Sequence, residues 1–194
     1  MRKLKIVEHI SLDGVIQHTP DDNGFSYGDW NGPYRTPEGL QLTLAAYGNR
    51  FDVLLGRRTY DQFSAYWPAA PSGPMADGLN AATKYVATHH PDTLEWGPFQ
   101  AVGPDIAGDV ARIKAGEGPD IIVAGSSTMT STLVEHGLAD ELWLAVNPVL
   151  LGAGKRLFAD GTPARSFEFV RTQTTPSGIV FTTYRAAGGL RSQA

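Results

Sequence analysis

Apolar residues follow two alternating patterns along the chain. Short, almost continuously apolar runs are typical of strands buried on both faces of a sheet. Such runs occupy residues 4–12, 53–55, 84–88 and 120–125. Apolar residues at helical spacing predict helices between these runs. Those helices span residues 38–50, 59–66, 75–83, 105–116 and 126–137. Strands that alternate with helices favour an α/β fold with a mostly parallel sheet.

The last part of the chain has a different pattern. Residues 140–152 read as one long strand, and the late Pro148 suggests that this strand forms a sheet edge or contains a bulge. Residues 167–185 contain two alternating stretches around a Pro-Ser-Gly turn, which predict a β-hairpin. We therefore expect a mixed sheet that is mostly parallel and ends in an antiparallel hairpin. The expected single domain covers residues 1–185, and a tail covers 186–194.

Composition and charge narrow the class of protein. Hydrophobic residues make up 42% of 194 residues, which is enough for the core of one domain. The net charge is −4 and the basic residues are scattered, which argues against a nucleic-acid partner, because phosphate binders concentrate Lys and Arg on one face. The absence of cysteine excludes disulfides, cysteine-based zinc sites and a thiol nucleophile.

The N-terminus carries no visible targeting segment. Lys5, Glu8 and His9 interrupt its apolar run, which disfavours a signal peptide. No segment reaches the roughly 18 apolar residues that a transmembrane helix needs. We therefore expect a soluble, cytoplasmic protein with no membrane partner.

A long loop over residues 13–37 separates the first strand from the first helix. Connections beyond about 12–15 residues in compact domains are usually functional or disordered, and the aromatic residues here disfavour disorder. Those residues are Phe25, Tyr27, Trp30 and Tyr34. We interpret the loop as an active-site cover in which Trp30 becomes shielded when ligands bind. An ordinary Ω-loop is the alternative.

The turn Gly56-Arg57-Arg58-Thr59 lies between a buried strand and the start of a helix. A helix N-terminus already carries about half a positive charge, so two cations there are unfavourable unless an anion joins them. The sequence therefore predicts an anion-binding turn.

A second turn, Gly125-Ser126-Ser127-Thr128, also joins a strand to a helix. Free N–H groups and hydroxyls at a helix start favour anions. Gly125 lets a ligand approach the backbone, or else lets the helix pack closely on the sheet. Both turns lie at carboxyl ends of strands, where α/β sheets bind ligands, and a dinucleotide with a 2′-phosphate would satisfy both. The hypothesis is NADPH, although no G-x-G-x-x-G follows a strand, which disfavours a Rossmann domain.

Two further places are candidates for ligand contact. Thr88 and His89 end a strand at the same edge, where His89 contacts a phosphate or the adenine, or is an exposed loop histidine. A metal shared by His89 and His90 is disfavoured because neighbouring strand residues point to opposite faces, so we expect no metal site. Asp13 follows Ser11 at the end of the first strand, as a turn-former, a ligand contact or both.

Together these segments resemble the dihydrofolate reductase-like superfamily. Within it the chain is most similar to the reductase domain of the bifunctional riboflavin-biosynthesis deaminase-reductase and to the stand-alone relatives of that domain. The matching segments are SLDGVIQ (11–17), LLGRRTYDQF (54–63), YVAT (85–88), IIVAGSSTMTSTLVEHGLADELWL (121–144), NPVLLGAGKRLF (147–158) and SGIVFTTYR (177–185). They extend over nearly the whole chain.

The resemblance implies a three-layer α/β/α sandwich that binds NADPH across the carboxyl ends of the strands, often as a homodimer. The 2′-phosphoadenosine end would contact Gly56, Arg57, Arg58, Thr59, Thr88 and His89. The pyrophosphate would contact Gly125, Ser126, Ser127 and Thr128. The nicotinamide would be bordered by Ile10, Asp13 and Gly14.

The implied activity is NADPH-dependent reduction of a small heterocyclic substrate, most like 5-amino-6-(5-phosphoribosylamino)uracil reductase of riboflavin biosynthesis. The candidates for the proton donor are His9, Asp13 and Glu38, with water as a competitor. Dihydrofolate reductases carry an acid on the first helix, but the matching position here is about Leu40, and Glu38 is the nearest acid. Dihydrofolate reductase and a non-catalytic NADP-binding sensor remain the alternatives.

Overall fold

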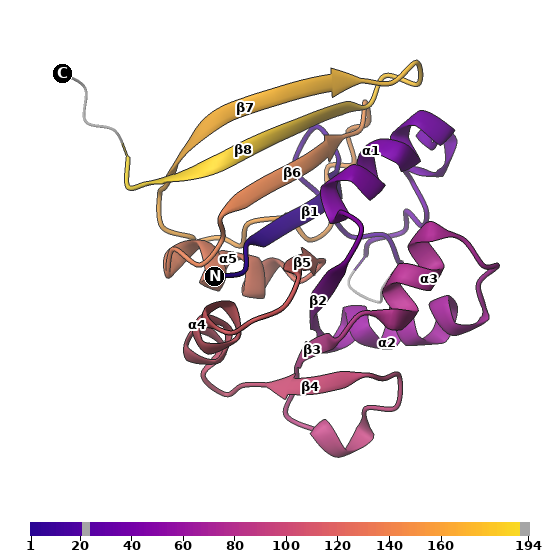
Figure 1. The fold of residues 1–194 in the computed structure, drawn as a ribbon. Helices are drawn as coiled ribbons and strands as arrows, with labels where there is room; N and C mark the ends of the chain where they lie inside the picture. Colours follow the sequence, from indigo (N-terminus) through magenta and orange to yellow (C-terminus); the bar gives the residue numbers. More distant parts are fainter. Residues whose placement is uncertain (21–23, 191–194) are drawn as a thin grey trace.

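The computed structural model describes residues 1–20 and 24–190, in which one eight-stranded sheet runs through the molecule (Figure 1). The strands are β1 (Leu4–Ile10), β2 (Phe51–Gly56), β3 (Lys84–Ala87), β4 (Phe99–Val102), β5 (Asp120–Ala124), β6 (Glu141–Val146), β7 (Ser166–Thr174) and β8 (Val180–Gly188). Their order is β4-β3-β2-β5-β1-β6-β8-β7. Every pair from β4 to β6 is parallel, whereas β8 is antiparallel to both β6 and β7. The predicted mixed sheet with a C-terminal hairpin is confirmed.

Helices cover both faces of the sheet. The helices α1 (Pro37–Tyr47), α2 (Arg57–Tyr66) and α3 (Pro74–Ala81) pack on one face, and α4 (Ile106–Ala115) and α5 (Ser127–Glu135) pack on the other (Figure 1). Short 3₁₀ turns form over Gly32–Tyr34, Trp67–Ala69 and Pro91–Thr93. This arrangement confirms the three-layer sandwich. In the described part of the chain, no helix is long and apolar enough to cross a membrane.

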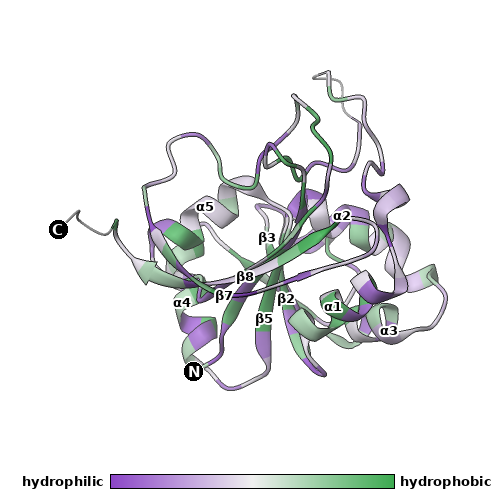
Figure 2. Cartoon of the chain, turned by 90° about the horizontal axis from the view of Figure 1, so that it is seen from above, coloured by the Kyte–Doolittle hydropathy of each residue, from purple (hydrophilic) through white to green (hydrophobic). Residues whose placement is uncertain are grey.

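A hydrophobic core lies on each face of the sheet, because successive side chains of the central strands point to opposite faces. On β2, Val53 and Leu55 pack with Tyr60 and other residues under α1–α3, whereas Leu54 faces the other way and joins the core that includes Leu133 of α5. Figure 2 shows hydrophobic colour running along the strands between the helices. Each such buried side chain contributes about 1.5–3 kcal/mol to stability. The strands are therefore apolar on both faces, as buried parallel strands require.

Two sequence-based expectations about strands were wrong. The long strand predicted over 140–152 ends at Val146, because Pro148 has no N–H to continue the ladder. The observed strand, β6, lies between β1 and β8, so it does not form a sheet edge. Strand β4 had no predicted counterpart, because it is short, largely exposed and preceded and followed by Gly-Pro pairs.

Candidate functional site

A cavity of about 1420 Å³ opens at the carboxyl ends of β1, β2 and β5. Its wall includes Val7, Glu8 and His9 of β1, residues 16–19 of the long loop, and side chains of α1 and α2. Residues 154–156 and 158–160 close another side. The cavity lies where parallel α/β sheets bind ligands, because the loops that follow neighbouring strands diverge there.

The two turns predicted from the sequence meet at one end of this cavity. All eight residues of the β2–α2 turn (56–59) and the β5–α5 turn (125–128) line it. A Cβ atom on Gly56 would lie 2.8 Å from Ser126 Oγ, and one on Gly125 would collide with Thr59. Gly125 and Ser126 both have left-handed backbones, with φ of 66° and 57°. The turns therefore bring the N-termini of α2 and α5 side by side, which favours an anion between them.

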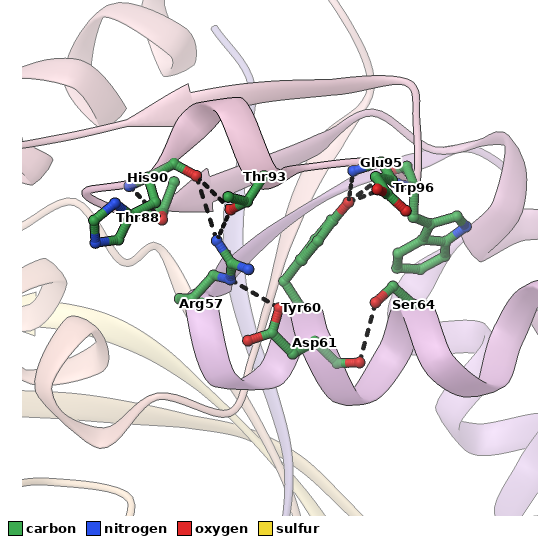
Figure 3. Close-up of polar contacts among 9 residues, drawn as sticks. All are labelled: Arg57, Tyr60, Asp61, Ser64, Thr88, His90, Thr93, Glu95 and Trp96. Carbon is green, nitrogen blue, oxygen red and sulfur yellow. Dashed lines mark hydrogen bonds and ion pairs between the residues drawn. The ribbon is translucent and has the colours of Figure 1, made fainter.

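Arg57 and Arg58 have different surroundings. Arg57 Nε donates to Asp61 Oδ1 at 2.8 Å, and its guanidinium also donates to Thr93 Oγ1 and the His90 carbonyl (Figure 3). A carboxylate of the chain therefore already balances Arg57. Arg58 is exposed on the cavity wall. Contact of either residue with a ligand phosphate stays a prediction.

The end of β3 lies outside the cavity lining. Thr88 Oγ1 accepts a hydrogen bond from the His90 N–H at 3.0 Å, which shapes the turn after the strand (Figure 3). His89 is exposed. Because Arg57 donates to the His90 carbonyl, this segment is tied to the β2–α2 turn. Thr88 and His89 therefore neighbour the predicted adenosine end, and their role stays a prediction.

Glu8 lies where β1 meets the β5–α5 turn, and sequence reasoning missed it. Its Oε1 accepts a hydrogen bond from the Gly125 N–H. Burial raises the pKa of the Glu8 carboxyl to about 8, although this hydrogen bond acts in the other direction. The available signal was an acidic residue in a largely apolar strand, LKIVEHI. Such a residue is rarely buried without a reason.

His9 and His18 also line the cavity, and the pKa of each imidazole is lowered. Burial, followed by the charges of His18 and Arg35, lowers the pKa of His9 to about 4. His9 Nδ1 lies 3.4 Å from Asn147 Nδ2. His18 stacks on Trp30 with ring centroids 4.6 Å apart, and burial, followed by the charge of Arg35, lowers its pKa to about 4. Both imidazoles are therefore neutral at pH 7.

Trp30 anchors the long loop. It is only 8% exposed, packs with Val15 and Phe25, and its Nε1 donates to the Gln17 carbonyl at 2.6 Å. The loop reaches α2 through a 3.0 Å hydrogen bond from Gln62 Nε2 to Thr19 Oγ1. Trp30 thus supports the cavity wall from behind while His18 forms part of its surface. Further shielding of Trp30 by ligands stays a prediction, and residues 21–23 of this loop lie outside the described ranges.

The other residues that the sequence predicted near the nicotinamide or as proton donors lie outside the cavity lining, and most of them shape the backbone near the end of β1. Asp13 accepts hydrogen bonds from Ser11 Oγ at 2.6 Å, which lowers the pKa of its carboxyl, and from the Leu151 and Gly152 N–H groups at 3.2 and 2.8 Å. Gly14 has φ of 80° and forms the turn, and the Ile10 carbonyl accepts from the Asn147 N–H. Glu38 is exposed in the first turn of α1. Among the described residues, the cavity lining does not include Ile10, Asp13, Gly14 or Glu38.

The fold and the position of the cavity define a class of protein, namely α/β proteins with a dihydrofolate reductase-like sheet. The solved dihydrofolate reductase from Enterococcus faecalis, complexed with NADP(H) and RAB-propyl, shares this fold: the TM-score is 0.61 at 19% identity, over 95% of this chain and 96% of that one. Within this class, the profile of the RibD C-terminal domain family matches residues 2–181. The chain belongs to that family.

Two further sequences and two further solved structures are similar to this chain. The uncharacterised Bacillus subtilis proteins YyaP and YwjB are 30% and 28% identical, over 72% and 83% of this chain and 77% and 85% of theirs. A putative riboflavin biosynthesis protein from Shewanella sp. PV-4 has a similar structure, with a TM-score of 0.72 at 21% identity over 96% of this chain and 99% of that one. The structure of a pyrimidine reductase-like protein from Corynebacterium diphtheriae has a TM-score of 0.63 at 15% identity, over 96% of this chain and 92% of that one.

Proposed function

We propose that this protein is an NADPH-dependent reductase of a small heterocyclic substrate, most like 5-amino-6-(5-phosphoribosylamino)uracil reductase. The observation that carries the proposal is one continuous cavity with two unlike ends. Adjacent helix N-termini with Arg58 form one end, Glu8 of β1 adjoins it through the Gly125 N–H, and His9 leads toward the other end. A dinucleotide bound with its phosphates on the turns reaches β1 with its far ring. There the protein positions the substrate against the nicotinamide and excludes water.

Membership of the RibD C-terminal domain family supports a reductase of this type. The wall of the cavity favours a uracil-type substrate over folate. Leu40 occupies the α1 position on the wall, and Glu38, the nearest acid on that helix, is outside the lining. The α1 acid that would contact a pterin is therefore missing.

Calorimetry of NADPH and NADH binding tests the cofactor. We expect NADPH to bind more tightly, and Arg58→Ala to weaken NADPH selectively. Arg112→Ala is the matched control, because Arg112 is an exposed arginine on α4 whose guanidinium pairs with Asp109. Equal affinities of the wild type for NADPH and NADH would contradict NADPH dependence.

Oxidation of NADPH, followed with a panel of substrates, tests the reaction. The panel contains 5-amino-6-(5-phosphoribosylamino)uracil, dihydrofolate and simple quinones. Turnover of the uracil supports the proposal, and turnover of dihydrofolate alone replaces it with folate reduction. Tight NADPH binding without any turnover favours a sensor. Light scattering and cell fractionation test the homodimer and the cytoplasmic location, which are part of the same proposal.

A further inference from the structure

Reduction by a nicotinamide transfers a hydride, so a proton must come from another source. Of the three donors expected from the sequence, His9 lines the cavity but is neutral at pH 7, because its pKa is about 4. Asp13 accepts three hydrogen bonds that stabilise its ionised form. Glu38 is exposed outside the described cavity lining. None of them offers a proton at the nicotinamide end.

Glu8 has the geometry that those residues lack. Strands β1 and β5 pair only from Leu4 to Ile6 on β1, so Glu8 lies where the two strands part at the cavity floor. One carboxyl oxygen accepts the Gly125 N–H, the first amide of the β5–α5 turn. The carboxyl therefore stands in the cavity lining, against the turn expected to hold the pyrophosphate.

The surroundings of Glu8 disfavour its ionised form. The ionisable group placed against it is Tyr47 of α1, which carries no positive charge. Among the described residues no lysine or arginine forms an ion pair with Glu8. Glu8 is half-buried, and a carboxylate largely withdrawn from water without a cation is costly, so this environment favours the protonated form.

We propose that Glu8 is a catalytic acid that donates the proton in the reduction, which deepens the proposed function and rests on it. The C4 hydride of NADPH, with its electron pair, forms a new C–H bond at the electrophilic carbon of the substrate, and NADPH becomes NADP⁺. The C–N or C–O π bond, or the C–O bond of the sugar ring, breaks toward the heteroatom. That heteroatom takes the Glu8 proton, and the carboxylate left behind keeps the Gly125 hydrogen bond. Water reprotonates Glu8 after product release.

Infrared spectroscopy tests the proton on Glu8 without any substrate. Wild-type protein at pH 7 should show the C=O stretch of a protonated carboxyl that ionises near pH 8. The band should be absent in Glu8→Gln and present in Glu117→Gln, a matched control because Glu117 is exposed before β5, at the opposite edge of the sheet. The band should also shift when NADPH is added. Absence of the band at pH 7, or a band unmoved by bound NADPH, overturns the proposal.

Turnover of 5-amino-6-(5-phosphoribosylamino)uracil gives the second test. Glu8→Gln should lower kcat by about 10²–10⁴-fold while its NADPH affinity stays that of the wild type, and Glu8→Asp should recover part of kcat. The wild-type kcat/KM should fall above pH 8, and this fall should disappear in Glu8→Gln. Full kcat in a Glu8→Gln protein that binds NADPH overturns the role of Glu8. Failure of the wild type to bind NADPH contradicts the proposed function instead, and the infrared band at pH 7 still decides whether Glu8 carries a proton.

Discussion

The two ends of the cavity are built on opposite physical terms. The turn end consists of backbone N–H groups, hydroxyls and Arg58 at the starts of two helices, open to solvent. The β1 end consists of Glu8, which adjoins the turn through the Gly125 N–H, and of His9 and His18; burial raises the pKa of Glu8 and lowers those of His9 and His18. Helix termini attract anions without being buried. Burial is the largest cause of the pKa shifts at the β1 end, so anion affinity and proton chemistry depend on different physical effects.

The largest expected effect concerns the contact between the two turns. Gly125→Ala should destabilise the protein by about 2–5 kcal/mol, because it adds a left-handed backbone cost and a collision with Thr59. Gly137→Ala is the matched control, because Gly137 has φ of 65° and open space around its would-be Cβ. Urea unfolding measures both variants. Equal losses would show that the turns do not constrain each other.

A cofactor titration on the same Gly125→Ala protein separates two readings of this glycine. A folded variant that no longer binds NADPH supports close approach of the pyrophosphate. A weakened fold that binds normally supports a packing role alone. Adding Thr59→Ala should recover the collision part of the loss, about 1–3 kcal/mol.

At the β1 end, Glu8→Gln should remove a pH dependence of stability. The folded pKa of about 8 exceeds the usual 4.5, so between these values the folded chain holds a proton that the unfolded chain has released. Wild-type stability should therefore fall relative to Glu8→Gln as pH rises from about 4.5 to 8, by a few kcal/mol in total. Urea unfolding from pH 5 to 9 measures the difference. Parallel curves for the two proteins would refute the raised pKa.

The two arginines of the turn should differ in their effect on cofactor choice. Arg58→Ala should narrow the preference for NADPH over NADH by about ten- to a hundredfold, the value of a charge-assisted contact of about 1.5–3 kcal/mol. Arg57→Ala should change it less, because Arg57 already pairs with Asp61, and that half-exposed pair contributes at most about 1 kcal/mol to stability. Calorimetry of both variants decides, and the reverse order would assign the phosphate to Arg57.

The smallest expected effect tests the loop that covers the β1 end. The pKa of His18 is lowered to about 4 from 6.5, so its contribution to stability is present above pH 6.5 and lost as pH falls toward 4. His18→Phe keeps a ring against Trp30 without titrating. Because His18 also faces the open cavity, we expect the variant to gain only about 1 kcal/mol on the wild type over this window. Thermal unfolding at pH 4.5 and 7 measures it.

The sequence predicted the strands and turns that form the site better than it predicted the side chains with shifted pKa values. The parallel strands and the turns after β2 and β5 follow from local patterns, namely apolar runs that stop at Gly56 and Gly125. Strand β4 was missed because its residues are mostly exposed and carry little periodic signal. Glu8 was not predicted as a site residue, because its position in the sequence does not reveal which distant segment its carboxyl contacts. Asp13 and Trp30 were found as notable residues, yet the structure gives their side chains backbone-holding contacts.

By itself the sequence determined the α/β alternation, the C-terminal hairpin and the two strand–turn–helix segments after β2 and β5, because each depends on residues close together in the chain. Only the tertiary structure decided that Glu8 meets the Gly125 N–H, that Arg57 is tied to the segment after β3, and that His18 rests on a buried Trp30. The Glu8 contact joins residues 117 positions apart. A local pattern carries no information on such pairs, and burial, which sets the protonation of a carboxyl, arises only when distant elements pack around it.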